Sequence, residues 1–343
     1  MPQQRPRAAA FRLTQAALAP AAVLAYPYFV GKLLIRSRAS GVSATAVSSL
    51  YARHMQHRLG TRPDETATRL LSALPGVSRG ALCLVTLPTR AAHRITGHVP
   101  PVYRYPYTGT PPLTHHAAAR TTYYDDAVAK HLDGARGLRQ LVVLGAGFDT
   151  RAHRADRDSP VRFFEVDTPA TQALKRGLLR RTGMDRPGVT YVPVDFLAQD
   201  WWQSLVAAGF EPAGPALFLW EAVTMYLDMR SVEGTLDRIA SAAPGSVVAF
   251  DYFSADTLRS RGPFMRYARA AARFVGEPLA YGLETSAPAG RHMAAVLGGH
   301  GLVLAEHRPI GTGVPGGPPP AGFVIATVPD VAGTRNRIPD RRR

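Results

Sequence analysis

Cysteine is nearly absent from this chain, because Cys83 is the one cysteine among its 343 residues. A single thiol cannot form an intramolecular disulfide bond, and it cannot supply the cysteine pair of a typical structural zinc site. The composition therefore excludes a disulfide-stabilised secreted scaffold and gives no sign of a metal site. We expect a protein of a reducing compartment, the cytoplasm.

Acidic residues are absent from the first 62 residues, which contain nine lysines and arginines. Residues 331–343 add five arginines against one acidic residue, whereas the segment between these two ends holds 27 basic and 24 acidic residues. The net charge of +16 therefore comes from the ends of the chain and does not indicate a nucleic-acid-binding body. We expect a basic tail at 331–343 and no specific nucleic-acid partner.

A charge-free run of nineteen residues, 13–31, follows a basic start. Its length approaches that of a membrane-spanning helix, but Pro20 and Pro27 interrupt it, and six of its residues are weakly hydrophobic alanines. No small-residue cleavage site follows the run directly, as a signal peptide would require. We predict an apolar, basic leader at 1–35 that packs on the domain or contacts a membrane surface peripherally.

Two further regions follow the leader. Residues 36–135 predict a helical cap, because apolar residues recur there with the 3.6-residue period of a helix, although five prolines between 97 and 112 predict a loop. In residues 136–330, short apolar strands alternate with helical segments, which is typical of a mainly parallel sheet covered by helices on both faces. The strands are predicted at 141–144, 161–167, 189–195, 216–221 and 246–251, with an antiparallel pair at 302–306 and 323–327 on the sheet edge. An insertion at 254–285 is expected near the carboxyl ends of the strands, where such sheets bind ligands.

Glycine or an acidic residue ends each of the first four predicted strands. The first strand runs into Gly145-Ala146-Gly147, and glycines let the backbone approach a ligand because they have no Cβ. Asp167 ends the second strand and can accept hydrogen bonds from both hydroxyls of a ribose. Its alternative role is the N-cap of the helix that opens at Pro169.

The remaining two strand ends extend this pattern to a nucleoside site. Asp195 can accept a hydrogen bond from an exocyclic amine, the adjacent Phe196 can pack on a base, and Glu221 ends the fourth strand. An acidic rim would repel a pyrophosphate but attract a sulfonium. S-adenosylmethionine therefore fits better than NAD, whose fingerprint would place a third glycine where this chain has Thr150.

Several stretches of the sequence carry a family resemblance. They are residues 140–154 (QLVVLGAGFDTRAHR), 164–167 (FEVD), 194–196 (VDF) and 221–227. They resemble the leucine carboxyl methyltransferase family, and more closely its bacterial branch of S-adenosylmethionine-dependent O-methyltransferases. The resemblance is clearest over residues 117–251. It implies a class I methyltransferase-like (Rossmann-like) α/β fold, with a mainly parallel seven-stranded sheet, N-terminal helices and a lid insertion.

The resemblance also implies roles for the residues that match its motifs. Asp167 holds the cofactor ribose, Asp195 and Phe196 border the adenine, and Glu221 lies near the methionine portion. Arg120 matches the arginine that pairs with the cofactor carboxylate. The cofactor-binding residues predicted in this way are Arg120, Gly145, Gly147, Asp167, Asp195, Phe196 and Glu221. Arg53 is the candidate for a basic residue that relatives contribute from their N-terminal helices.

These features predict methyl transfer from S-adenosylmethionine to a carboxylate or hydroxyl oxygen of a small-molecule metabolite. A carboxylate needs no general base, whereas a hydroxyl does, and the sequence identifies no base. Tyr226 is predicted to orient the acceptor, with core packing as the alternative. His115 and His116 do not predict a metal site, because adjacent residues on a helix point apart. Two other functions stay open: an NAD-dependent oxidoreductase, and a non-catalytic protein that binds a nucleoside or a membrane.

Overall fold

The computed structural model describes residues 4–40, 44–133, 137–196, 198–274, 276–284, 288–311 and 318–330. In this part of the chain a seven-stranded sheet has the order β3-β2-β1-β4-β5-β7-β6. Its strands are β1 (Gln140–Leu144), β2 (Arg162–Asp167), β3 (Val189–Pro193), β4 (Ala216–Trp220), β5 (Val247–Phe253), β6 (Val303–Ile310) and β7 (Ala321–Thr327). Strands β1 to β5 pair in parallel, whereas β7 runs antiparallel to β5 and β6. This topology is that of class I methyltransferases, which confirms the predicted fold class and the antiparallel pair.

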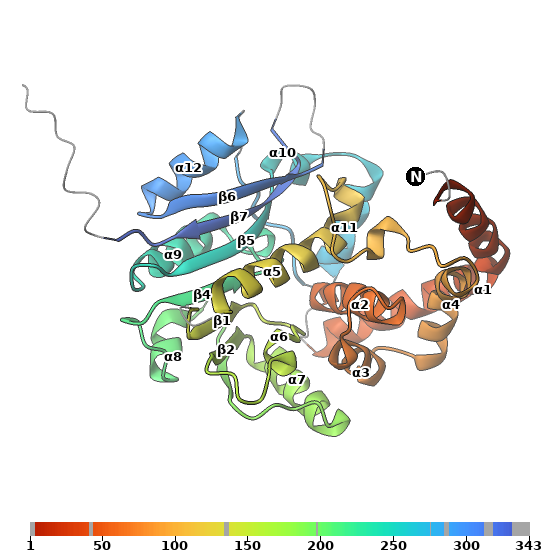
Figure 1. Cartoon of the computed structure of the whole chain (residues 1–343), viewed down its shortest axis with the longest axis horizontal. Helices are drawn as coiled ribbons and strands as arrows, with labels where there is room; N and C mark the ends of the chain where they lie inside the picture. The colour runs from red at the N-terminus through yellow and green to blue at the C-terminus, as the bar shows by residue number, and fades with distance from the viewer. Residues whose placement is uncertain are drawn as a thin grey trace, which may run out of the picture.

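Side chains that alternate along the strands bury both faces of the sheet. In β1, Val142 and Leu144 pack in one core, and Leu141 and Val143 pack in the other. The first core lies under α8 (Trp201–Ala207), α9 (Met229–Ala240) and α12 (Ala289–Gly299). The second core lies under α5 (His116–Leu132) and α6 (Arg151–Arg154). The apolar strands of the sequence therefore form the central layer of a three-layer domain (Figure 1).

Local sequence signals set the ends of the helices that follow β2, β3 and β4. Helix α7 (Pro169–Thr182) opens with a proline, whose fixed φ suits a first helical position, and it ends at Gly183 with φ +67°. The carboxylates of Asp200 and Asp228 accept main-chain N–H groups at the starts of α8 and α9. These caps fix where each helix begins relative to the strand end before it.

The N-terminal helices form a separate cluster at one end of the molecule (Figure 1). They are α1 (Gln4–Ser40), α2 (Ala44–Arg58), α3 (Glu65–Ala73) and α4 (Arg79–Thr96). The stretch 97–112 is a loop, as predicted, apart from the short η1 (Pro101–Tyr103), and η2 (Leu113–His115) leads into α5. A third core joins this cluster to α7, which places α2 beside the carboxyl ends of the strands.

Helix α1 continues through both of its prolines and past residue 35, where the sequence suggested a boundary. It packs along α4 and buries Phe11 and Phe29, while Leu24 on its outer face is 82% exposed. By length and composition alone, Pro6–Ala39 could cross a membrane, since 18 of its residues in a row have a mean hydropathy of 1.6, yet the helix lies against α4 along one side. The helix thus contacts α4 along one side, while 6% of its most apolar stretch is buried, and contact of the leader with a membrane stays a prediction.

The predicted insertion after β5 contains two helices, α10 (Ala255–Arg259) and α11 (Pro263–Phe274). The guanidinium of Arg38 at the end of α1 donates a hydrogen bond of 3.1 Å to the carbonyl of Phe274 and lies over its ring. The main-chain N–H of Ala280 donates to the carbonyl of Met225, which follows β4. The insertion thus closes over the strand ends and touches the leader helix. The tail at 331–343 lies outside the described residues.

Candidate functional site

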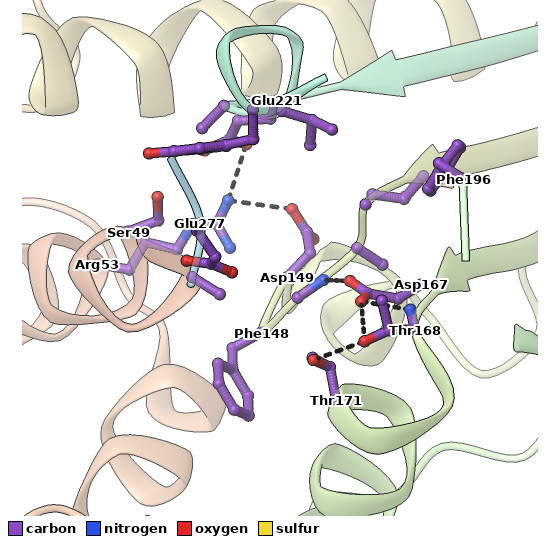
Figure 2. A pocket seen from close by; sticks show the side chains of 18 residues that line it. Ser49, Arg53, Phe148, Asp149, Asp167, Thr168, Thr171, Phe196, Glu221 and Glu277 are labelled. Carbon is purple, nitrogen blue, oxygen red and sulfur yellow. Dashed lines mark hydrogen bonds and ion pairs between the residues drawn. The ribbon is translucent and has the colours of Figure 1, made fainter. Parts of the chain in front are cut away.

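A cavity lies at the carboxyl ends of β1, β2 and β4 (Figure 2). Among the residues predicted from the sequence, the structure places Arg53, Gly145, Gly147, Asp167, Phe196, Glu221 and Tyr226 on its wall. Ser49 and Arg53 come from α2, Thr168 and Thr171 from the start of α7, and Glu277 from the insertion. Segments that are up to 230 residues apart in the sequence therefore meet at one edge of the sheet.

The glycine loop after β1 has no room for side chains. Gly145 and Gly147 have φ values of +63° and +45°, in the region that favours glycine. A Cβ at Gly145 would lie 2.4 Å from Cγ2 of Val223, and a Cβ at Gly147 would lie 2.8 Å from Cβ of Ala46. Both glycines are therefore required by backbone conformation and by the close approach of neighbouring segments, apart from any role towards a ligand.

Asp167, at the end of β2, is buried on the wall of this cavity and 9% exposed. Its carboxylate accepts hydrogen bonds from the main-chain N–H groups of Gly147 and Thr168, so it joins the glycine loop to the start of α7. Burial raises the pKa of Asp167, although these N–H groups favour the charged form. The structure thus fixes one carboxylate at the place predicted for a ribose.

Glu221 and Asp149 face each other across Arg53, as Figure 2 shows. The guanidinium of Arg53 donates to Asp149 (3.0 Å) and to Glu221 (2.9 Å), and that of Arg151 donates to Glu221 at 2.7 Å and also to Asp149. Burial opposes ionisation of Glu221, but the Arg53 and Arg151 guanidinium groups hold its pKa below the usual range. The guanidinium groups of Arg151 and Arg53 likewise lower the pKa of Asp149, against the opposing effect of burial. Both carboxylates are therefore charged and paired.

The ion pairs continue away from the cavity and connect the cap to the sheet. Arg62, which follows α2 and is 1% exposed, pairs with Asp64 (2.5 Å) and with Asp125 on α5 (2.6 Å). Asp125 also accepts a hydrogen bond from Nε of Arg151 at 2.9 Å. No sequence pattern predicted a role for Arg62, Asp64 or Asp125. Asp149 and Arg151 stood in a quoted motif, but their partners on α2 and β4 are too distant in sequence for any pattern to pair them.

The predicted rim of four strand ends differs from the observed wall at Asp195. Strand β3 ends at Pro193, the side chain of Asp195 is exposed, and only the next residue, Phe196, reaches the wall. Glu221 is present but paired with two arginines. The acidic character comes instead from a different set, since four carboxylates and one guanidinium line the cavity: Asp149, Asp167, Glu221, Glu277 and Arg53.

Arg120 lies on a second cavity that adjoins the first one. Its guanidinium pairs with Asp251 on β5 at 3.1 Å, and Ala222 and Tyr226 line both cavities. Ala222 has φ +59°, and its N–H donates to Asp251 at 2.6 Å, which holds this strained conformation in place. The buried carboxylate of Asp251 therefore binds both Arg120 and the main chain of Ala222, and so stabilises the wall that the two cavities share.

Comparison with known proteins gives the family of the central segment. Residues 87–240 match the model of the leucine carboxyl methyltransferase family. A protein of Frankia alni named "Putative S-adenosyl-L-methionine-dependent methyltransferase" is 38% identical over 155 residues, which are 45% of this chain and 51% of that protein. Similarly named proteins of Streptomyces avermitilis and Mycobacterium avium are 40% and 35% identical, over 45% and 54% of this chain and 52% and 58% of their own lengths.

The chain thus spans about half the length of the curated relatives that it matches. The matched segment includes the glycine loop, Asp167, Phe196 and Glu221, which all line the first cavity. Residues 87–240, a little under half of the chain, therefore match the leucine carboxyl methyltransferase family, which the motifs of the sequence resemble.

Proposed function

We propose that this protein is an S-adenosylmethionine-dependent O-methyltransferase that acts on a carboxylate or hydroxyl of a small molecule. The observation that carries the proposal is the placement of Asp167, a buried carboxylate at the end of β2 that faces the glycine loop in a strand-end cavity. The match of residues 87–240, which form most of this cavity, to the leucine carboxyl methyltransferase family supports the same activity.

The residues present fit this cofactor better than a dinucleotide. The absence of Cβ atoms at Gly145 and Gly147 keeps main chain, not side chains, at the floor beside Asp167. The wall has four carboxylates, and the guanidinium groups of Arg53 and Arg151 balance two of them, Asp149 and Glu221. The remaining negative charge favours a sulfonium and opposes a pyrophosphate. This electrostatic balance argues against the NAD-dependent alternative.

In the proposed reaction, residues of the first cavity and of its neighbour contact different parts of the cofactor. Asp167 accepts hydrogen bonds from the ribose hydroxyls, and Phe196 packs on the adenine, whereas Asp195 lies off the wall and has no assigned contact. Glu221 lies near the methionine portion, and Arg120, which lines the adjoining second cavity beside Asp251, is the arginine that the family resemblance assigns to its carboxylate. When bound, S-adenosylmethionine supplies the methyl group. A lone pair of the acceptor oxygen forms the O–CH3 bond while the S–CH3 bond breaks and leaves its electrons on sulfur.

The remaining requirement is to place the acceptor oxygen in line with that bond. Tyr226 lies where the two cavities meet and is the residue proposed to orient the acceptor. A carboxylate acceptor reacts in its ionised form and has no proton to lose. A hydroxyl acceptor would have to transfer its proton to a base during the reaction.

We also propose that α1 contacts a membrane surface while the enzyme works in the cytoplasm. The outer face of α1 exposes Leu13, Leu24 and Ile35, and no acidic residue occurs in the first 62 residues to oppose anionic lipid. Liposomes of neutral and anionic lipid, incubated with the intact chain and with a chain lacking residues 1–35, test this contact. Binding that survives the truncation would contradict it.

Calorimetric titration with S-adenosylmethionine, S-adenosylhomocysteine and NAD tests the proposed activity. The intact protein should bind the first two compounds. Asp167→Ala should weaken both by about 100-fold, because it removes a charged acceptor of two hydrogen bonds. Asp185→Ala, at an exposed aspartate far from the cavity wall, is the matched control and should change neither affinity.

Three outcomes are decisive. Loss of sulfonium binding in Asp167→Ala alone supports the proposal, and incubation with methyl-labelled cofactor then identifies the acceptor. Binding of NAD without binding of the other two compounds would favour the oxidoreductase. No binding of any of the three would leave a non-catalytic protein.

A further inference from the structure

The second cavity has a volume of about 290 Å³ and lies beside the cofactor cavity, with Ala222 and Tyr226 on the wall between them. It is lined by elements that no sequence pattern connects: α1, α2, α5, the short η3 (Thr224–Tyr226), β5 and α11. An acceptor in this space would reach the methyl donor only at the shared wall.

Apolar side chains dominate the lining of the second cavity. They are Leu34, Ala222, Met225, Phe253, Met265, Ala268, Ala271, Ala272 and Leu279. The alanines of α11 leave space where longer side chains would fill it, and Met265, Ala268 and Ala272 recur at the spacing of one helix face. The cavity therefore exists because one face of α11 is built from small residues.

Four polar side chains line this cavity: Ser48, His116, Arg120 and Tyr226. The guanidinium of Arg120 pairs with Asp251 at 3.1 Å. Nδ1 of His116 donates a hydrogen bond to the carbonyl of Leu113 at 2.8 Å. Burial and the nearby Arg120 lower the pKa of His116 to about 4, so that its ring is neutral near pH 7. The rest of the space offers apolar contact and little competing charge.

We infer that the second cavity binds the apolar body of the methyl acceptor and that the acceptor is a lipophilic molecule with one oxygen nucleophile at its end. The inference rests on the proposed function, because it assigns the acceptor to a chamber beside the proposed cofactor site. Leu34 belongs to α1, the helix proposed to contact lipid. The second cavity therefore borders the surface from which a lipophilic acceptor would come.

Titration with straight-chain acids of increasing length tests this inference. Butanoate, octanoate and dodecanoate are titrated by calorimetry into the intact protein saturated with S-adenosylhomocysteine, and 1-octanol is the arm that separates an alcohol from an acid head group. Each added methylene that becomes buried contributes about 0.8 kcal/mol, so Kd should fall by about fourfold per methylene until the chamber is full.

Leucine substitutions on α11 locate the binding. Ala268→Leu and Ala271→Leu point an added side chain at the cavity and should each weaken octanoate binding by about tenfold, while the Kd of S-adenosylhomocysteine changes by less than about twofold. Ala270→Leu, on the exposed face of the same helix, is the matched control and should change neither value. Circular dichroism of each variant checks that the helix content is unchanged.

Two results would overturn the inference. One is an affinity that does not depend on chain length, and the other is an equal effect of the three leucine variants. Failure of S-adenosylhomocysteine to bind would instead overturn the proposed function. The acid titrations are repeated without that compound, so the two failures can be told apart.

Discussion

The two adjoining cavities of this protein are built in opposite ways. The cavity at the strand ends has carboxylates, a guanidinium and a glycine loop on its wall, and buried ion pairs hold its side chains in place. The neighbouring cavity has an apolar wall whose space comes from alanines on α11. A ligand of the first cavity is recognised by charge and hydrogen bonds, whereas a ligand of the second is recognised by size and hydrophobicity.

The largest expected loss of stability comes from breaking the buried ion pairs of the first cavity, in contrast to an ion pair on the exposed surface. Arg151→Ala would leave Asp125, Asp149 and Glu221 buried with less positive charge and should lower the free energy of unfolding by about 3–5 kcal/mol. Arg259→Ala removes a guanidinium that is paired with Glu284 on the exposed surface and should cost less than about 1 kcal/mol. Urea denaturation measures both, and equal losses would contradict the structural role given to Arg151.

A smaller effect concerns the floor of the first cavity. Gly145→Ala should cost about 2–4 kcal/mol, because its φ is left-handed and its Cβ would overlap Val223. Gly183→Ala, with φ +67° and open space around it, should cost only about 1 kcal/mol. Adding Val223→Ala to Gly145→Ala should recover the free energy of unfolding by which the cost of Gly145→Ala exceeds that of Gly183→Ala. No recovery in urea denaturation would mean that Val223 is not the obstacle.

The contrast between the cavities also explains which parts the sequence could predict. Strand ends are marked by apolar runs that stop at a glycine or an acid, so Gly145, Asp167 and Glu221 were placed correctly on the wall. Asp195 was not, because β3 stops at Pro193, the N–H of Val194 makes one further hydrogen bond to the carbonyl of Asp167, and the side chain of Asp195 is exposed. A two-residue error at a strand end is enough to change which side chain faces the ligand.

No sequence pattern predicted the second cavity. Its lining extends from Leu34 to Leu279, and the alanines that create its space are indistinguishable in sequence from the alanines of any helix. The ion pairs also escaped prediction, since Arg62 and Asp125 are brought together only when the cap packs on α5. Sequence patterns thus predicted the sheet and the residues attached to it, but not what tertiary packing assembles from separate helices.

Acidification should affect the two cavities differently. Burial raises the pKa of Asp167, and a protonated carboxyl accepts hydrogen bonds from ribose hydroxyls more weakly than a carboxylate does, so affinity for S-adenosylhomocysteine should fall as the group takes up a proton. Titrations from about pH 7 to about pH 4.5 should show this fall, and Asp167→Asn should reduce it. Binding of 1-octanol should stay constant over most of this range, because His116, with a pKa of about 4, stays largely neutral. A parallel fall of both affinities would contradict the separation of the two sites.

The smallest expected effect lies at the wall that the cavities share. Ala222 has φ +59°, and replacing it by glycine relieves about 1 kcal/mol of left-handed strain but adds a similar entropy to the unfolded chain. Ala222→Gly should therefore change the free energy of unfolding by less than about 0.5 kcal/mol, whereas Ala222→Val should cost about 1–2 kcal/mol because a β-branched residue fits this conformation poorly. If glycine is as costly as valine in urea denaturation, the methyl group of Ala222 is needed for packing. If it is neutral, the hydrogen bond from the N–H of residue 222 to Asp251 is sufficient to hold the boundary at which a methyl group would pass from one cavity to the other.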